Sequence, residues 1–163
     1  GHRNIGYVGN CRNEDRYVGY MDTLKKHNLD LIPEYVIETD QTEGEGYEAI
    51  KQLLKSEDCP TGIYCANDIT AVGMLKYLSK CRNLYFTPSI IASDDIEEAQ
   101  FTKPMLTTVG LPKNEMGKFA LYLLLDRMKG GHTGVVRMEL AGHLMVRNSC
   151  SNVSDLSWSD YVI

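Results

Sequence analysis

Short, β-rich apolar runs alternate with helical patterns along most of the chain, and this alternation is the feature that most restricts its fold. Four runs have the residue types of buried strands: 4–8, 35–37, 62–65 and 89–92. Apolar residues recur at helical spacing over 15–26, after the segment 42–46, and after Asp68, which is placed to cap the third helix. Strands that alternate with helices of this length favour an α/β fold with a parallel, doubly wound sheet.

The pattern changes in the last third of the chain. A short strand is expected at 106–109. A long helix is expected at about 114–128, with four apolar residues facing inward: Met116, Phe119, Leu123 and Leu124. After a glycine-rich turn, the segments 135–140 and 144–147 have the pattern of a β-hairpin.

Composition restricts the partners of the chain. The 163 residues carry a formal net charge of −5, whereas binding to a nucleic-acid backbone needs clustered Lys and Arg. The five cysteines are widely spaced and include no CxxC pair, which favours reduced thiols in a cytoplasmic protein over a disulfide scaffold or a zinc site. No apolar run approaches the ~18 residues of a membrane helix. This stretch is therefore expected to touch neither DNA nor a membrane.

Polar side chains follow the predicted strands at the edge where open parallel sheets bind ligands, just beyond the carboxyl ends of the strands. Gln41 follows the second strand, Asn67 the third and Asp94 the fourth. Arg16 lies one helical turn after the Gly-Asn that ends the first strand. A guanidinium, amides and a carboxylate at one edge suit a polyhydroxylated ligand, because they supply both donors and acceptors of hydrogen bonds.

Each of these residues also has an ordinary structural interpretation. Arg16 can be a solvated helix residue, and Asp94 and Asp95 open an acidic run of the kind that often begins a helix. The four histidines lie in separate segments without metal-ligand spacing, so no metal site is predicted. The chain has no GxSxG, no phosphate loop and no dinucleotide-binding turn, so neither a cofactor nor an enzyme activity is expected.

Seven motifs follow one another along the chain: GHRNIGYVGN at 1–10, RYVGY at 16–20, GYEAIKQLL at 46–54, PTGIYCANDITAVGML at 60–75, PSIIASDD at 88–95, KPMLTTVGLPKNEMGKFA at 103–120 and LMVRNSC at 144–150. In this order, they resemble the effector-binding region of the lactose/galactose repressor (LacI/GalR) family of transcriptional regulators. The likeness covers nearly the whole chain except the end, and the joint order is far more specific than any one motif.

The resemblance implies the fold of the type I periplasmic binding proteins, represented mostly by its C-terminal lobe. Residues 1–110 would form that lobe, 111–140 a returning segment of the N-terminal lobe, 141–150 a closing strand and 151–163 a loosely attached tail. The helix of the returning segment would lack its usual partners. It is expected to expose an apolar face or to pack against a neighbouring chain.

Carried over residue by residue, the resemblance implies that Arg16, Asn67 and Asp94 contact the effector. Members of the family often carry an aromatic residue that stacks on the ligand ring where this chain has Gln41. A second contact expected near 111–113 also lacks an aromatic side chain. Both departures favour a ligand held by hydrogen bonds over a stacked sugar.

The implied function is that of an effector sensor in a repressor. A small polar ligand, a sugar or a sugar-like molecule, would bind in a cleft between two lobes and control operator binding by a separate helix-turn-helix. The protein would act as a cytoplasmic homodimer, with four interface candidates: Gln52, Met74, Tyr77 and Phe101. One rival is an extracytoplasmic sugar-binding protein that feeds an ABC transporter. Another is an α/β enzyme that uses Asp94 and Asp95.

Overall fold

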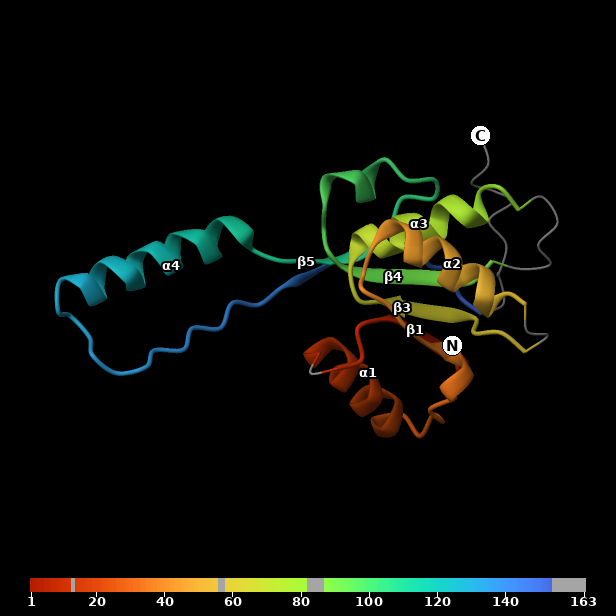
Figure 1. The fold of residues 1–163 in the computed structure, drawn as a ribbon, viewed down its shortest axis with the longest axis horizontal. Helices are drawn as coiled ribbons and strands as arrows, with labels where there is room; N and C mark the ends of the chain where they lie inside the picture. Colours follow the sequence, from red (N-terminus) through yellow and green to blue (C-terminus); the bar gives the residue numbers. More distant parts are fainter. Residues whose placement is uncertain (13, 56–57, 82–86, 154–163) are drawn as a thin grey trace.

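A six-stranded sheet forms the centre of the molecule (Figure 1). The computed structural model describes residues 1–12, 14–55, 58–81 and 87–153. The strands are β1 (Ile5–Gly9), β2 (Val36–Glu38), β3 (Gly62–Cys65), β4 (Ser89–Asp94), β5 (Thr107–Gly110) and β6 (His143–Met145). Their spatial order is β2-β1-β3-β4-β5-β6; the first five are parallel and β6 runs antiparallel to β5. The predicted α/β class with a parallel sheet is confirmed.

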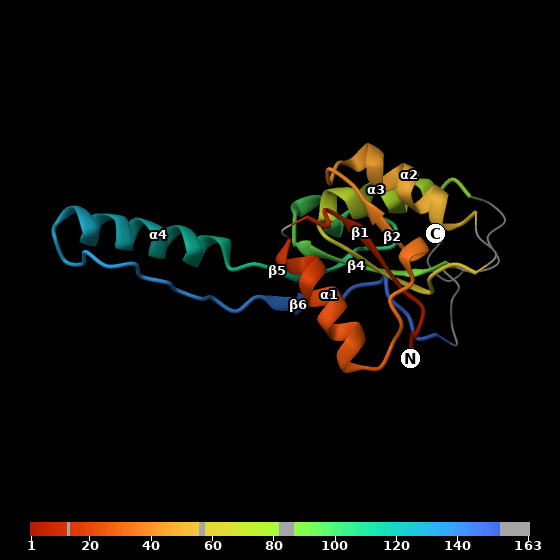
Figure 2. The ribbon, with the colours of Figure 1, turned by 60° about the horizontal axis from the view of Figure 1, so that its bottom comes forward.

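Helices cover both faces of the sheet, as a parallel sheet requires. Helix α1 (Asp15–Lys26) lies on one face, and α2 (Glu43–Leu53) and α3 (Asp68–Leu78) lie together on the other (Figure 2). Successive residues of β1 show the alternation, since Tyr7 packs in the cluster under α1 and Val8 in the cluster under α2 and α3. Short 3-10 turns, η1 (Pro33–Tyr35) and η2 (Glu97–Gln100), precede β2 and follow β4.

Helices α2 and α3 pack backbone against backbone because a glycine faces the partner helix from each side. A Cβ atom at Gly46 would overlap the carbonyl oxygen of Thr70, and one at Gly73 would overlap that of Glu43. Helix α2 begins upstream of Gly46, since Thr42 and Glu45 form a capping box in which each side chain accepts a hydrogen bond from the other's backbone N–H.

The chain leaves the sheet after β5 and returns as β6. Between the two strands, residues 111–142 project as an arm that contains α4 (Lys113–Met128) (Figure 1). No residue of α4 is buried, and Phe119 is 40% exposed. The prediction that its apolar residues face inward is wrong, whereas the exposed apolar face implied by the resemblance is present.

The predicted hairpin between 135–140 and 144–147 is also wrong. Residues 135–140 form no strand, and Val135 is 98% exposed. The residues of β6 pair instead with β5, where Val109 lies opposite Leu144. The edge of β5 offers free backbone N–H and C=O groups to β6, and β5 is packed in the sheet. The exposed segment 135–140 is not packed against the sheet and is therefore a poorer partner for β6.

The beginning of the predicted tail is attached to the sheet. The Ser151 N–H donates to Ser89 Oγ at 3.0 Å, and the Ser151 carbonyl oxygen lies 2.9 Å from His2 Nε2. The remaining tail residues, 154–163, lie outside the described residues. Within the ranges given above, none of the helices has both the length and the apolar character needed to cross a bilayer.

The contact between α2 and α3 generates a prediction. Gly73→Ala should lower the free energy of unfolding by about 1–3 kcal/mol, because the added methyl group must push two backbones apart. Gly117→Ala in α4 is the matched control, since no atom lies within 4 Å of its added Cβ. It should leave stability unchanged or raise it by up to about 1 kcal/mol through helix propensity. Urea unfolding followed by circular dichroism measures both, and equal effects would contradict the backbone contact.

Candidate effector site

Arg16 is held at the carboxyl edge of the sheet, between the start of α1 and the end of β3. Its Nη1 donates to the carbonyl oxygen of Ala66 at 2.5 Å, and its Nε lies 3.4 Å from Glu14 Oε1. Glu14 is itself the N-cap of α1 and accepts from the Arg16 backbone N–H. The arginine is therefore a partly buried residue of α1 whose guanidinium is held at the edge by the Ala66 carbonyl and by Glu14.

Asn67 joins two turns of the same edge. Its Oδ1 accepts from the backbone N–H of Thr70 at 3.0 Å, which makes it the N-cap of α3. Its Nδ2 donates to the carbonyl oxygen of Gln41 at 3.2 Å, and Gln41 adopts a positive φ of 62° in the turn after β2. The structure thus places Asn67 and Gln41 side by side.

The predicted cap residue Asp68 does not cap α3. Its side chain is fully buried, and its carboxylate accepts from the Ile96 N–H at 2.9 Å and from Thr108 Oγ1 at 2.5 Å. Asn67 takes the capping role because its backbone is extended (φ −142°, ψ 162°), as an N-cap requires. The Asp68 carboxylate is left to bind the elements beside α3.

Asp94 ends β4 and completes the edge. Burial raises the pKa of its carboxyl above the ordinary value, and Arg16 is close enough to oppose that rise. Nearby Asp68 raises the pKa further, and Lys113 lowers it. Arg16, Asn67, Gln41 and Asp94 therefore share one edge of the sheet; their contact with an effector stays a prediction.

Lys113 is a charged group that the sequence reasoning did not select. Its Nζ donates to the carbonyl oxygen of Asp95 at 3.2 Å, and its charge acts on Asp94. The resemblance places a second ligand contact near 111–113, and the charge of the lysine in this segment is the sequence signal for it. Two cations around one partly buried carboxylate suit a ligand that has both acceptors and donors.

Two hollows adjoin this edge. One of about 400 Å³ is lined by residues of the turn after β4 and the start of α4, among them Asp95, Pro112 and Lys113. The other, of about 760 Å³, lies under α1 and is lined mainly by apolar groups such as Tyr20, Tyr64 and Ile91, with Arg16 at its border. The first lies beside the polar groups described above, whereas the second is mainly apolar, and of the four predicted site residues its lining includes only Arg16.

The four interface candidates differ in what they expose. Phe101 is 76% exposed and lines a groove of about 550 Å³, and Gln52 is also exposed. Tyr77 is partly buried against Tyr47, with the two rings edge to face at 5.1 Å. Met74 is fully buried in the core under α2 and α3, so its assignment to an interface does not fit the structure.

Groups suited to metal or thiol chemistry do not gather at the edge. In the described part of the chain, no three His, Cys, Asp or Glu side chains come together in a way that could hold a metal ion. All five cysteines are free thiols. Burial raises the pKa of the Cys65 thiol to about 12, which keeps this thiol protonated at neutral pH.

The fold of the chain is that of a periplasmic-binding-protein-like domain. The family described as "Periplasmic binding protein-like domain" matches residues 1–150, and the chain belongs to this family. The chain is 32% identical over 161 residues to the HTH-type transcriptional repressor PurR of Haemophilus influenzae, covering 94% of this chain and 48% of that protein. It is 34% identical over 155 residues to the HTH-type transcriptional repressor CytR of Escherichia coli, covering 91% and 45%.

A solved structure gives the same assignment. A LacI family transcriptional regulator from Enterococcus faecium with bound ribose matches with a TM-score of 0.76 and 27% identity, over 91% of this chain and 57% of that chain. The resemblance to LacI-family regulators is thus confirmed. The chain spans about half the length of the curated relatives it matches.

The raised pKa of Asp94 predicts a pH-dependent effect of Asp94→Asn. The folded state disfavours the charged carboxyl, so the stability of the unsubstituted protein should fall, relative to the variant, as pH rises through the folded pKa. Thermal unfolding should show a melting-temperature advantage of the variant that grows between about pH 4 and about pH 7.

Asp22→Asn is the matched control, because Asp22 is an exposed carboxyl of α1. Its effect on the melting temperature should vary less over the same pH range. An Asp94→Asn effect that does not change with pH would contradict the burial of this carboxyl.

Proposed function

We propose that the chain is the effector-sensing part of a LacI-type transcriptional repressor. A small polar ligand, a sugar or sugar-like molecule, binds at the edge formed by Arg16, Asn67, Gln41 and Asp94. The observation that supports this is that the Arg16 guanidinium, the Asn67 amide and the partly buried Asp94 carboxylate lie at one rim of the parallel sheet, beside the turn that contains Gln41. The ribose bound to the Enterococcus faecium regulator supports the carbohydrate class.

The ligand acts by binding and not by reaction. It binds one arrangement of the two lobes of the longer protein more tightly than the other, and this difference in affinity changes operator binding by a separate helix-turn-helix. The net charge of −5 agrees with DNA contacts made elsewhere. Because Gln41 replaces an aromatic residue, hydrogen bonds provide the specificity. Residues 1–110 and 141–150 belong to the C-terminal lobe in this proposal, and 111–140 to the N-terminal lobe.

The repressor works as a cytoplasmic homodimer. The second copy contacts the side of the molecule formed by α2 and α3. Exposed Phe101, together with Gln52 and Tyr77, belongs to this contact surface. The repressor names of the curated relatives and the free cysteines favour this function over a transport-associated sugar-binding protein.

The ligand edge is tested by calorimetry on the full-length protein, after a thermal-shift screen of sugars, sugar phosphates and purines has found the probe. Arg16→Ala and Asp94→Ala should each weaken binding by about 1.5–3 kcal/mol, the scale of a hydrogen bond to a charged group. Arg12→Ala is the matched control, because this side chain is 83% exposed and pairs only with Glu38 among the ion pairs described. Unchanged affinity in both site variants would exclude the proposed edge.

The interface is tested by sedimentation. Phe101→Ser should shift the full-length protein toward monomer at micromolar concentration, because it removes an exposed apolar anchor. Val18→Ser on α1 replaces another exposed apolar residue and should leave the dimer intact. A dimer that tolerates Phe101→Ser as well as Val18→Ser would contradict this interface.

A further inference from the structure

The turn after β4 holds two residues in a backbone conformation that side chains rarely adopt. Asp94 has a φ of 127° and Asp95 a φ of 49°. Non-glycine residues keep positive φ values only where the surrounding contacts enforce them. Because Asp94 is the carboxylate of the candidate effector site, the contacts that hold this turn also decide where that carboxylate lies.

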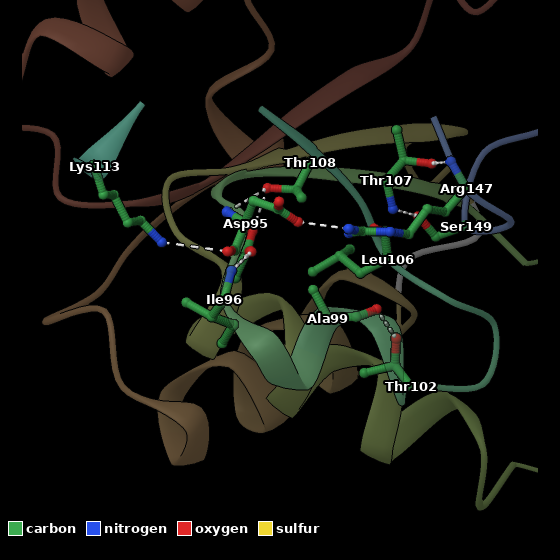
Figure 3. A network of polar contacts seen from close by, with 11 residues as sticks. Asp95, Ile96, Ala99, Thr102, Leu106, Thr107, Thr108, Lys113, Arg147 and Ser149 are labelled. Atoms are coloured by element: carbon green, nitrogen blue, oxygen red, sulfur yellow. Dashed lines mark hydrogen bonds and ion pairs between the residues drawn. The ribbon is translucent and has the colours of Figure 1, made fainter. Parts of the chain in front are cut away.

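Backbone groups of the turn are held from three different elements. The Asp95 N–H donates to Thr108 Oγ1 of β5 at 3.4 Å, and the Asp95 carbonyl oxygen accepts from Lys113 Nζ at the start of α4 (Figure 3). The Ile96 N–H donates to the buried Asp68 carboxylate of α3. The turn is therefore fixed at Asp95 and at the residue that follows it.

The side chain of Asp95 is held by Arg147, which follows β6. Arg147 Nη2 donates to Asp95 Oδ1 at 2.6 Å, and the two side chains are 10% and 22% exposed. Arg147 Nη1 donates to the carbonyl oxygen of Leu106 at 2.9 Å, and the Arg147 N–H donates to Thr107 Oγ1 at 2.9 Å (Figure 3). The guanidinium is thus positioned before it meets the carboxylate, and its burial limits the solvent screening that weakens surface pairs.

We propose that Arg147 is a positioning residue of the effector site: its ion pair with Asp95 holds the strained turn from which the Asp94 carboxyl reaches the ligand. This inference rests on the proposed function. Arg147 follows β6, the strand in which the chain returns from the arm, and Lys113 is the first residue of α4 near the start of the arm. Both connections of the arm therefore contact the residue next to Asp94, and a movement of either connection changes the geometry of the site.

Two measurements without ligand test the positioning role. In Arg147→Gln, the amide hydrogen of Ile96 should exchange at least about tenfold faster. A tenfold change corresponds to about 1.4 kcal/mol, which is the scale of one lost hydrogen bond. The carboxyl titration of Asp94, followed by carbon NMR, should move down toward its ordinary range because the relaxed turn admits water. Amides of α1 and α2 should keep their exchange rates.

Arg137→Gln is the matched control, since Arg137 is exposed on the arm. Arg147→Lys should restore part of both signals, and Asp95→Asn combined with Arg147→Gln should add little to either single effect. Unchanged exchange at Ile96 with an unchanged Asp94 titration would overturn the proposal. Faster exchange spread evenly over the whole chain would also overturn it, because that result indicates a general loss of stability.

Ribose binding to the full-length protein is the functional measurement. Arg147→Gln should raise the dissociation constant about tenfold, while Arg137→Gln leaves it unchanged. If the unsubstituted protein does not bind ribose or the other screened sugars, the carbohydrate assignment fails, and the ligand-free signals still decide the role of Arg147. If ribose binds equally well to Arg147→Gln, the positioning role fails while the proposed function stands.

Discussion

The candidate site depends on the hydrogen bonds of one buried carboxylate, that of Asp68. From the first turn of α3 it accepts hydrogen bonds from the backbone after β4 and from a threonine of β5, so one side chain joins three elements. A buried carboxylate is tolerated only when its acceptors are satisfied, and the positive end of a helix dipole favours it at this position. These hydrogen bonds fix the spacing between α3, β4 and β5, and they thereby fix the position of the turn that carries Asp94.

The local elements could be predicted to within a few residues because their signals are local. Helix α1 has the expected bounds of 15–26, and β3 those of 62–65. The choice between Asn67 and Asp68 as the cap could not be made from the sequence, since both residue types cap helices. What decides it is Thr108, a partner forty positions away. The resemblance nominated Met74 for the interface, but Met74 is buried; α3 is apolar on nearly all sides, so its spacing could not tell the inner face from the outer one.

For the candidate site too, some residues could be predicted from the sequence and others could not. The residue types at strand ends identified Arg16, Asn67, Gln41 and Asp94, because a parallel sheet brings its carboxyl ends to one edge. The sequence pattern does not place Lys113 or Arg147 near the candidate site, because both lie in the region where strands and helices no longer alternate. The apolar spacing of α4 correctly predicts a helix, but spacing alone does not show whether another element covers its apolar face.

The glycine contact between α2 and α3 determines how this part of the molecule can move. At the crossing of Gly46 and Gly73, the two helices touch through their backbones and no side chain lies between them to slide or repack. A rotation of this pair as one body would turn a small tilt at the rim where α3 starts into a larger displacement at the far end of the pair. A second copy docked against that end would register the tilt as a change of subunit angle.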